Sequence, residues 1–111
     1  MKNLKQIIYV GWEESERGWG TRPDGCSLHL TLNDFKAFEQ AYWKRMPKQV
    51  PDEYSRPADS PIIVGASPNL YRKIRASKNG VRYYESELVE LRDKKKLVYG
   101  SERSGWMPLE R

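Results

Sequence analysis

A tryptophan between two glycines, with charged residues on both sides, is the part of this sequence best suited to ligand chemistry. The indole of Trp19 offers a flat stacking surface, and its flanking glycines let backbone amides approach a ligand. Arg17 and Arg22 can each present paired N–H groups to a phosphate or carboxylate. An equally simple interpretation places Trp19 over the core and pairs Arg17 with Glu13 or Glu14.

Two strand-like runs are expected to position this segment. Residues 6–12 are apolar on both faces, which is typical of a covered strand, whereas residues 26–32 alternate between apolar and polar. That alternation predicts one buried and one solvated face, with His29 on the solvated face. Residues 13–25 exceed an ordinary hairpin connection, so they predict a long functional loop, with residues 23–25 as a turn inside it.

Further along the chain, patterning predicts a helix, a connection and a short strand. Thr31 and Asp34 can cap an amphipathic helix that ends before Pro47. Four prolines then predict that residues 47–61 form an extended connection and not a packed element. Residues 62–64 are typical of a short buried strand.

The second half contains two segments with conflicting periodicities. Ser67 and Pro68 predict the start of a helix that ends before Gly80, but Asn79-Gly80 is also a strong hairpin signal. We favour the helix over residues 68–79. In residues 86–99 a helical stripe and a strand pair both fit, and because propensity favours the helix only slightly, both interpretations stay open. Together these elements predict an α+β fold, a small antiparallel sheet with two or three helices packed on it, in a single domain spanning residues 1–111.

Positive charge is concentrated in the second half. The net charge is +5, and residues 71–111 contain eleven basic and six acidic residues against nine of each in residues 1–70. Aromatic and basic side chains interleave there, a mixture suited to stacked bases and phosphates, although the cations can equally form a solvated surface. The candidate ligand-binding residues are Arg17, Trp19, Arg22, Tyr71, Arg72, Arg75, Arg82 and Tyr84.

Catalysis has less support than binding. The lone Cys26 excludes an internal disulfide and disfavours a cysteine zinc site, so we expect it to be buried and inert, and we expect no metal or cofactor. Ser15 or Ser27 with His29 and an Asp would form a catalytic triad only through a geometry that spacing does not imply. No membrane-spanning or signal stretch is evident, so we expect a soluble, cytoplasmic bacterial protein.

The run Trp12-Glu13-Glu14-Ser15-Glu16-Arg17-Gly18-Trp19-Gly20, with the strand before it, resembles short phage proteins that block bacterial defences, and is similar to the Thoeris anti-defence sponges. The resemblance covers about the first 30 residues. It implies an oligomer that sequesters a cyclic nucleotide-type signal without cleaving it, and it assigns no individual residues.

The sequence therefore predicts a non-enzymatic homo-oligomer that recognises or sequesters a small anionic, nucleotide-type ligand. The alternative is a protein that binds nucleic acid, or a nucleic-acid-guided defence complex, through the cations Arg72, Lys73, Arg75, Lys78 and Lys94 to Lys96. A small hydrolase using the acidic residues of segment 13–25 is the third alternative.

Overall fold

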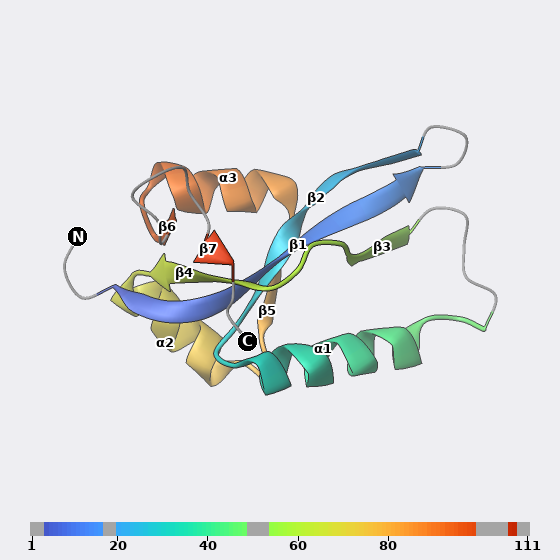
Figure 1. The fold of residues 1–111 in the computed structure, drawn as a ribbon, viewed down its shortest axis with the longest axis horizontal. Helices are drawn as coiled ribbons and strands as arrows, with labels where there is room; N and C mark the ends of the chain where they lie inside the picture. Colours follow the sequence, from blue (N-terminus) through green and yellow to red (C-terminus); the bar gives the residue numbers. More distant parts are fainter. Residues whose placement is uncertain (1–3, 17–19, 49–53, 100–106, 109–111) are drawn as a thin grey trace.

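An antiparallel sheet with helices on both faces forms the body of the protein (Figure 1). The computed structural model describes residues 4–16, 20–48, 54–99 and 107–108. The strand order is β5-β2-β1-β4-β6, with β3 paired to β1 and β7 to β4, and every pairing is antiparallel. The α+β prediction is confirmed. The elements are β1 Lys5–Glu16, β2 Gly20–His29, α1 Leu32–Arg45, β3 Tyr54–Pro57, β4 Ile62–Ala66, α2 Pro68–Ala76, β5 Val81–Tyr83, α3 Glu85–Asp93, β6 Leu97–Tyr99 and β7 Met107–Pro108.

Alternate residues of the central strand β1 serve two separate cores. Ile7 and Tyr9 pack with apolar residues of α2 and α3, whereas Ile8, Val10 and Trp12 pack with α1. Successive side chains of a strand point to opposite faces, so a strand that is apolar throughout must be covered on both. This is the arrangement that the apolar run at residues 6–12 predicts.

The prediction that His29 lies on a solvated face is wrong. Its side chain is 0% exposed and packs against Phe35 and Phe38 of α1, with ring centroids 5.1 and 5.0 Å away. Alternation in β2 does separate two faces, because Cys26 and Leu28 join the α2–α3 core. However, α1 packs over the second face and buries Ser27 and His29 there.

The long loop predicted for residues 13–25 is also wrong, because most of it belongs to a hairpin. β1 continues to Glu16 and β2 begins at Gly20, and these two residues are paired. Residues 23–25 do not form a turn but a bulge, in which Asp24 and Gly25 lie opposite Trp12. Gly25 has φ +82°, and a Cβ there would lie 2.0 Å from the carbonyl oxygen of Tyr83.

The proline-rich segment 47–61 is more than a connection. Its residues Tyr54–Pro57 form β3, which pairs with β1 from Trp12 to Ser15. Proline lacks an N–H donor, so Pro57 is tolerated at the end of a strand that β1 supports. The segment therefore contains a packed element, contrary to the prediction, and that element lies beside the outer half of the hairpin (Figure 1).

The helix boundaries agree with the capping signals. The Thr31 hydroxyl accepts from the backbone N–H of Asp34 at 3.1 Å, and α1 ends two residues before Pro47. The Ser67 hydroxyl accepts from the N–H of Leu70 at 3.3 Å, which confirms a helix over the hairpin alternative. Residues 86–99 divide between the two open interpretations, since α3 ends at Asp93 and a strand follows after a turn.

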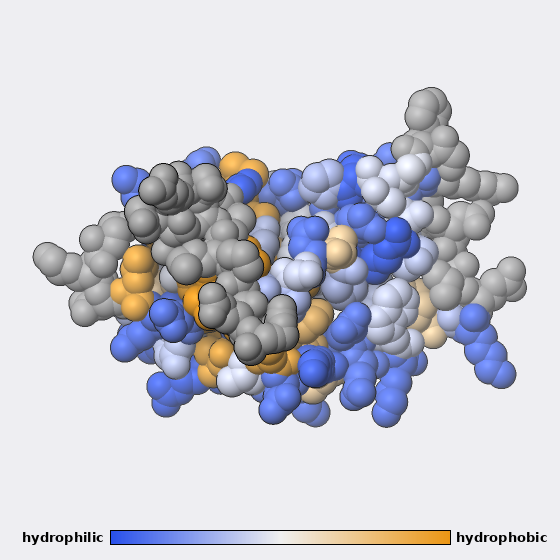
Figure 2. Space-filling model, viewed as in Figure 1, coloured by the Kyte–Doolittle hydropathy of each residue, from blue (hydrophilic) through white to orange (hydrophobic). Residues whose placement is uncertain are grey.

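The surface matches the polar composition. Figure 2 shows hydrophilic side chains across much of the described surface in that view, with smaller apolar areas between them. Within the described residues, no helix has the length and apolar character that crossing a membrane requires.

Candidate ligand-binding cleft

A cleft of about 410 Å³ opens where α1 crosses the bulged part of the sheet. Its volume falls in the range of ordinary ligand pockets. Five of its lining residues are aromatic and two are arginines, and they come from β1, α1, β3, β5 and the residue after β5. The lining residues are Trp12, Phe38, Tyr42, Arg45, Tyr54, Ser55, Arg82 and Tyr84.

Arg82 is held between two aromatic rings. Its guanidinium carbon lies 4.4 Å from the centroid of Trp12 and 4.6 Å from that of Tyr84. The same guanidinium donates to the carboxylate of Asp24 at 3.0 Å and to backbone carbonyls of β2 and β5. A cation stacked between rings and fixed by several hydrogen bonds has little freedom to move, so this wall of the cleft is preorganised.

Aromatic rings continue from the sheet to the rim. Trp12 meets Tyr42 edge to face at a centroid distance of 5.0 Å, Tyr42 meets Trp43 at 5.1 Å, and Trp43 meets Tyr54 at 6.1 Å. Trp12 is only 4% exposed, whereas Trp43 is 37% and Tyr84 58% exposed. Buried rings therefore support partly exposed ones that offer stacking surface to a ligand.

Polar contacts join the cleft walls. The Tyr42 hydroxyl donates to the backbone carbonyl of Ser55, and the Ser55 hydroxyl donates to Asp24, which also accepts from Arg82. Partial burial raises the pKa of Tyr42, so its hydroxyl keeps its proton at neutral pH. Within the described residues, Arg45 has no ion pair, so its charge is available at the rim.

A buried hydrogen-bonded chain lies behind the cleft. The Trp12 indole N–H donates to the Ser27 hydroxyl oxygen at 2.8 Å, and that oxygen lies 2.7 Å from His29 Nε2. His29 Nδ1 lies 2.7 Å from the backbone carbonyl of Asn79. A carbonyl only accepts, so Nδ1 carries the proton, Nε2 accepts from Ser27, and every group is satisfied.

This Ser27–His29 pair has the spacing of a nucleophile and base, as the triad alternative required. Both side chains are 0% exposed, so no substrate reaches the hydroxyl. Desolvation is the main reason that the pKa of His29 is lowered. These residues form a structural hydrogen-bond network that holds the Trp12 indole in place from behind the cleft.

The predicted ligand-binding residues are divided among three places. Arg82 and Tyr84 line the cleft. Arg22 lies on the exposed hairpin, where its guanidinium contacts Glu14 and Glu16, each at 2.6 Å. Tyr71, Arg72 and Arg75 belong to α2, on the opposite face of the sheet: Tyr71 packs on the core, Arg72 donates to Asn69 and Arg75 is exposed. Arg17 and Trp19 lie outside the described residues.

Sequence reasoning missed most of the cleft. Phe38, Tyr42 and Arg45 are spaced by four and three residues, so they lie on one face of α1. That spacing predicts an amphipathic helix, and we assigned its aromatic residues to the core. The one signal in the sequence that could have indicated a binding site is Arg45, which shares this helix face with Phe38 and Tyr42.

No protein-family model, curated protein or solved structure matches this chain. In the part of the chain that the structure describes, no three His, Cys, Asp or Glu side chains gather as metal ligands.

Proposed function

We propose that the cleft between α1 and the sheet binds a nucleotide-type ligand without chemical conversion, with the planar base against the aromatic side chains and the anionic part toward Arg45. The observation that carries the proposal is the convergence of five aromatic residues and two arginines on one cleft of about 410 Å³. Aromatic faces bind any base, and stacking contributes about 1–3 kcal/mol per base.

Electrostatics support the same orientation. Arg82 is neutralised by Asp24, whereas Arg45 has no ion pair among the described residues, so the free charge of the cleft lies at the α1 rim. An anion at that rim can accept from the guanidinium while the attached ring stacks on the partly exposed Tyr84 or Tyr54. If the phosphate of the ligand were buried deep in the cleft, it would lack a charged partner. We therefore place it at the open edge of the cleft.

Native mass spectrometry with a panel of linear and cyclic nucleotides tests the proposal. The expected result is a saturable mass increase at micromolar ligand, with the ligand recovered intact after the protein is denatured. The same spectra report the subunit count, and homo-oligomerisation stays a prediction until then. Absence of binding across the panel would refute the proposal, and a converted ligand would favour the hydrolase alternative.

Matched variants localise the binding. Tyr84→Ala removes a ring that is 58% exposed and should weaken binding about tenfold or more, because one stacked ring is lost. Tyr84→Phe keeps the ring and should bind like the unmodified protein. Arg72→Gln removes a cation from the opposite face and serves as the charge control for Arg45→Gln, which should weaken binding. Equal effects of the two arginine changes would argue against the cleft.

The second candidate is binding of nucleic acid, and the exposed cations of α2 favour it. Arg72, Lys73 and Arg75 are exposed along this helix, and Lys78 follows its end. A long polyanion releases counterions on binding, so its affinity should fall steeply with salt, whereas a small nucleotide should show a shallower dependence. A steep slope that Arg72→Gln and Arg75→Gln reduce would favour nucleic acid.

Sequestration of a nucleotide-type signal by a phage anti-defence protein would follow from non-hydrolytic binding. Its support is the resemblance of about the first 30 residues, together with a Ser27–His29 pair that is buried behind the cleft and out of reach of a ligand. Titrating the purified protein against a defence effector activated by its nucleotide signal tests this role, and the expected result is stoichiometric inhibition.

A further inference from the structure

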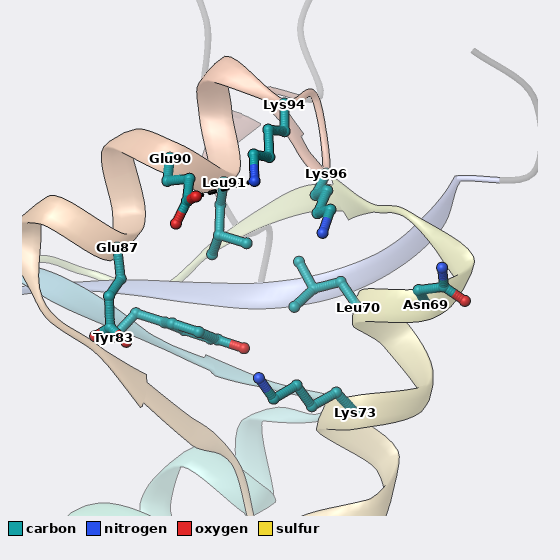
Figure 3. Close-up of a pocket in the computed structure, with 9 residues that line it drawn as sticks. All are labelled: Asn69, Leu70, Lys73, Tyr83, Glu87, Glu90, Leu91, Lys94 and Lys96. Carbon is teal, nitrogen blue, oxygen red and sulfur yellow. Dashed lines mark ion pairs between the residues drawn. The ribbon is translucent and has the colours of Figure 1, made fainter.

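A second cleft lies on the other face of the sheet, between α2 and α3. Its volume is about 280 Å³, and it shares no lining residue with the aromatic cleft. β5 separates the two sites by alternation, since Arg82 points into the aromatic cleft and Tyr83 into this one. We call it the lysine cleft; it is lined by Asn69, Leu70, Lys73, Tyr83, Glu87, Glu90, Leu91, Lys94 and Lys96 (Figure 3).

The acidic groups of the lysine cleft are already engaged. The Glu90 carboxylate pairs with Lys94 at 2.9 Å, one helical turn along α3. The Glu87 carboxylate accepts from the backbone N–H of Tyr84 at 2.9 Å, where the positive end of the α3 dipole also stabilises it. Lys73 and Lys96 have no ion pair within the described residues.

Tyr83 contributes a hydroxyl donor to the same space. In Figure 3 the Tyr83 hydroxyl and the Lys73 amino group approach one another across the cleft, and Lys96 reaches in from the α3 side. The Lys73 Nζ atom lies 5.7 Å from the centroid of the Tyr83 ring, and that ring is 6% exposed. Burial raises the pKa of Tyr83, so the hydroxyl stays protonated and able to donate.

We propose that the lysine cleft is a binding site for a phosphate-type oxyanion, held by Lys73, Lys96 and the Tyr83 hydroxyl. The two ammonium groups and the hydroxyl extend from α2, from the residue before β6 and from β5, so they surround the cleft instead of forming one surface row. A tetrahedral phosphate has several acceptor oxygens and can take donors from such different directions at once. Leu70 and Leu91 supply the apolar part of the lining between the charged groups.

Two-dimensional amide NMR tests this site with inorganic phosphate and pyrophosphate as probes, at constant ionic strength and with chloride as the reference anion. The expected result is saturable shifts at the amides of residues 69–73, 83 and 94–96. Lys73→Gln and Lys96→Gln should each weaken phosphate binding about tenfold, the usual effect of losing one charge-assisted hydrogen bond.

Lys95→Gln is the matched control. Lys95 lies in the same turn as Lys96, is exposed and does not line the cleft, so the change removes the same charge without removing a donor. It should leave phosphate affinity within about twofold of the unmodified protein. Equal weakening by Lys95→Gln and Lys96→Gln, or shifts that chloride reproduces, would overturn the proposal.

Tyr83→Phe separates the hydroxyl from the ring. It keeps the buried aromatic group and should reduce phosphate affinity severalfold while leaving binding at the aromatic cleft unchanged. This site stands independently of the proposed function. If phosphate caused no shifts at the lysine cleft, the oxyanion site would be refuted. The proposed function would still stand if Tyr84→Ala weakened nucleotide binding and Lys73→Gln did not.

Discussion

Acidification should destabilise this protein through His29, the only histidine of the chain. The imidazole is 0% exposed, and desolvation is the largest cause of its lowered pKa, outweighing the raising effects of the Asn79 carbonyl and of Asp34. Protonation would also turn Nε2 into a donor toward Ser27, and the hydroxyl proton of Ser27 would then lose its acceptor. The folded state therefore resists a proton that the unfolded chain accepts readily.

The sign and size of this loss of stability follow from the linkage between proton binding and folding. A lowered folded pKa means that the unfolded state binds more protons below about pH 6.5, so the free energy of unfolding falls as pH falls. If the folded imidazole stays neutral, the loss is about 0.4 kcal/mol at pH 6.5 and about 1.4 kcal/mol at pH 5.5, the limit for one proton.

Urea unfolding followed by tryptophan fluorescence, at about pH 7.5, 6.5 and 5.5, measures this loss. The variants His29→Gln and His29→Asn have no titrating imidazole. Whichever of them folds serves as the reference, because it retains the pH dependence that comes from the carboxylates. As pH falls, the free energy of unfolding should decrease more for the unmodified protein than for the variant. A difference that stays constant from pH 7.5 to 5.5 would refute a buried, neutral His29.

Two further predictions concern the bulge and the thiol beside it. Gly25→Ala should lower the free energy of unfolding by more than about 2 kcal/mol, because φ is +82° and the new Cβ would meet the Tyr83 carbonyl oxygen at 2.0 Å. Gly20→Ala, at φ +87° with no atom within 4 Å, should cost only about 1 kcal/mol in the same urea titration, and equal losses would contradict the close approach. Burial raises the pKa of Cys26 to about 12, so a thiol reagent should label it only after denaturation, and rapid labelling at neutral pH in the folded state would show that this part of β2 opens.

Local signals in the sequence determined where α1 and α2 begin. Thr31 before Asp34, and Ser67 before Pro68, satisfy backbone N–H groups that any helix start leaves unpaired, so the cap position follows from chemistry within a few residues. Cys26 was likewise predicted to be buried, and it is 0% exposed. Such interactions require no knowledge of the rest of the fold.

Local signals failed where a distant segment changed the surroundings. Asp24 and Gly25 have the composition of a turn, but Trp12 and β5 hold them in a bulge instead. The charged residues of segment 13–25 are typical of a loop, yet Glu14 pairs with Arg22 across β1 and β2, and Glu13 pairs with Arg56 across β1 and β3. Composition alone does not distinguish these cases, because cross-strand pairs form only once the register is set.

The sequence by itself determined the class of fold, the starts of α1 and α2, and the apolar pattern that requires a sheet covered on both faces. Only the tertiary structure decided which groups meet: α1 folding over β2 buries His29, and β5 pairing with β2 places Arg82 between Trp12 and Tyr84. Trp12 and Arg82 are separated by 70 positions in the chain, and nothing in their local neighbourhoods links them. Capping and alternation act over a few residues, whereas a binding cleft depends on contacts between distant segments, which form only when the whole chain packs.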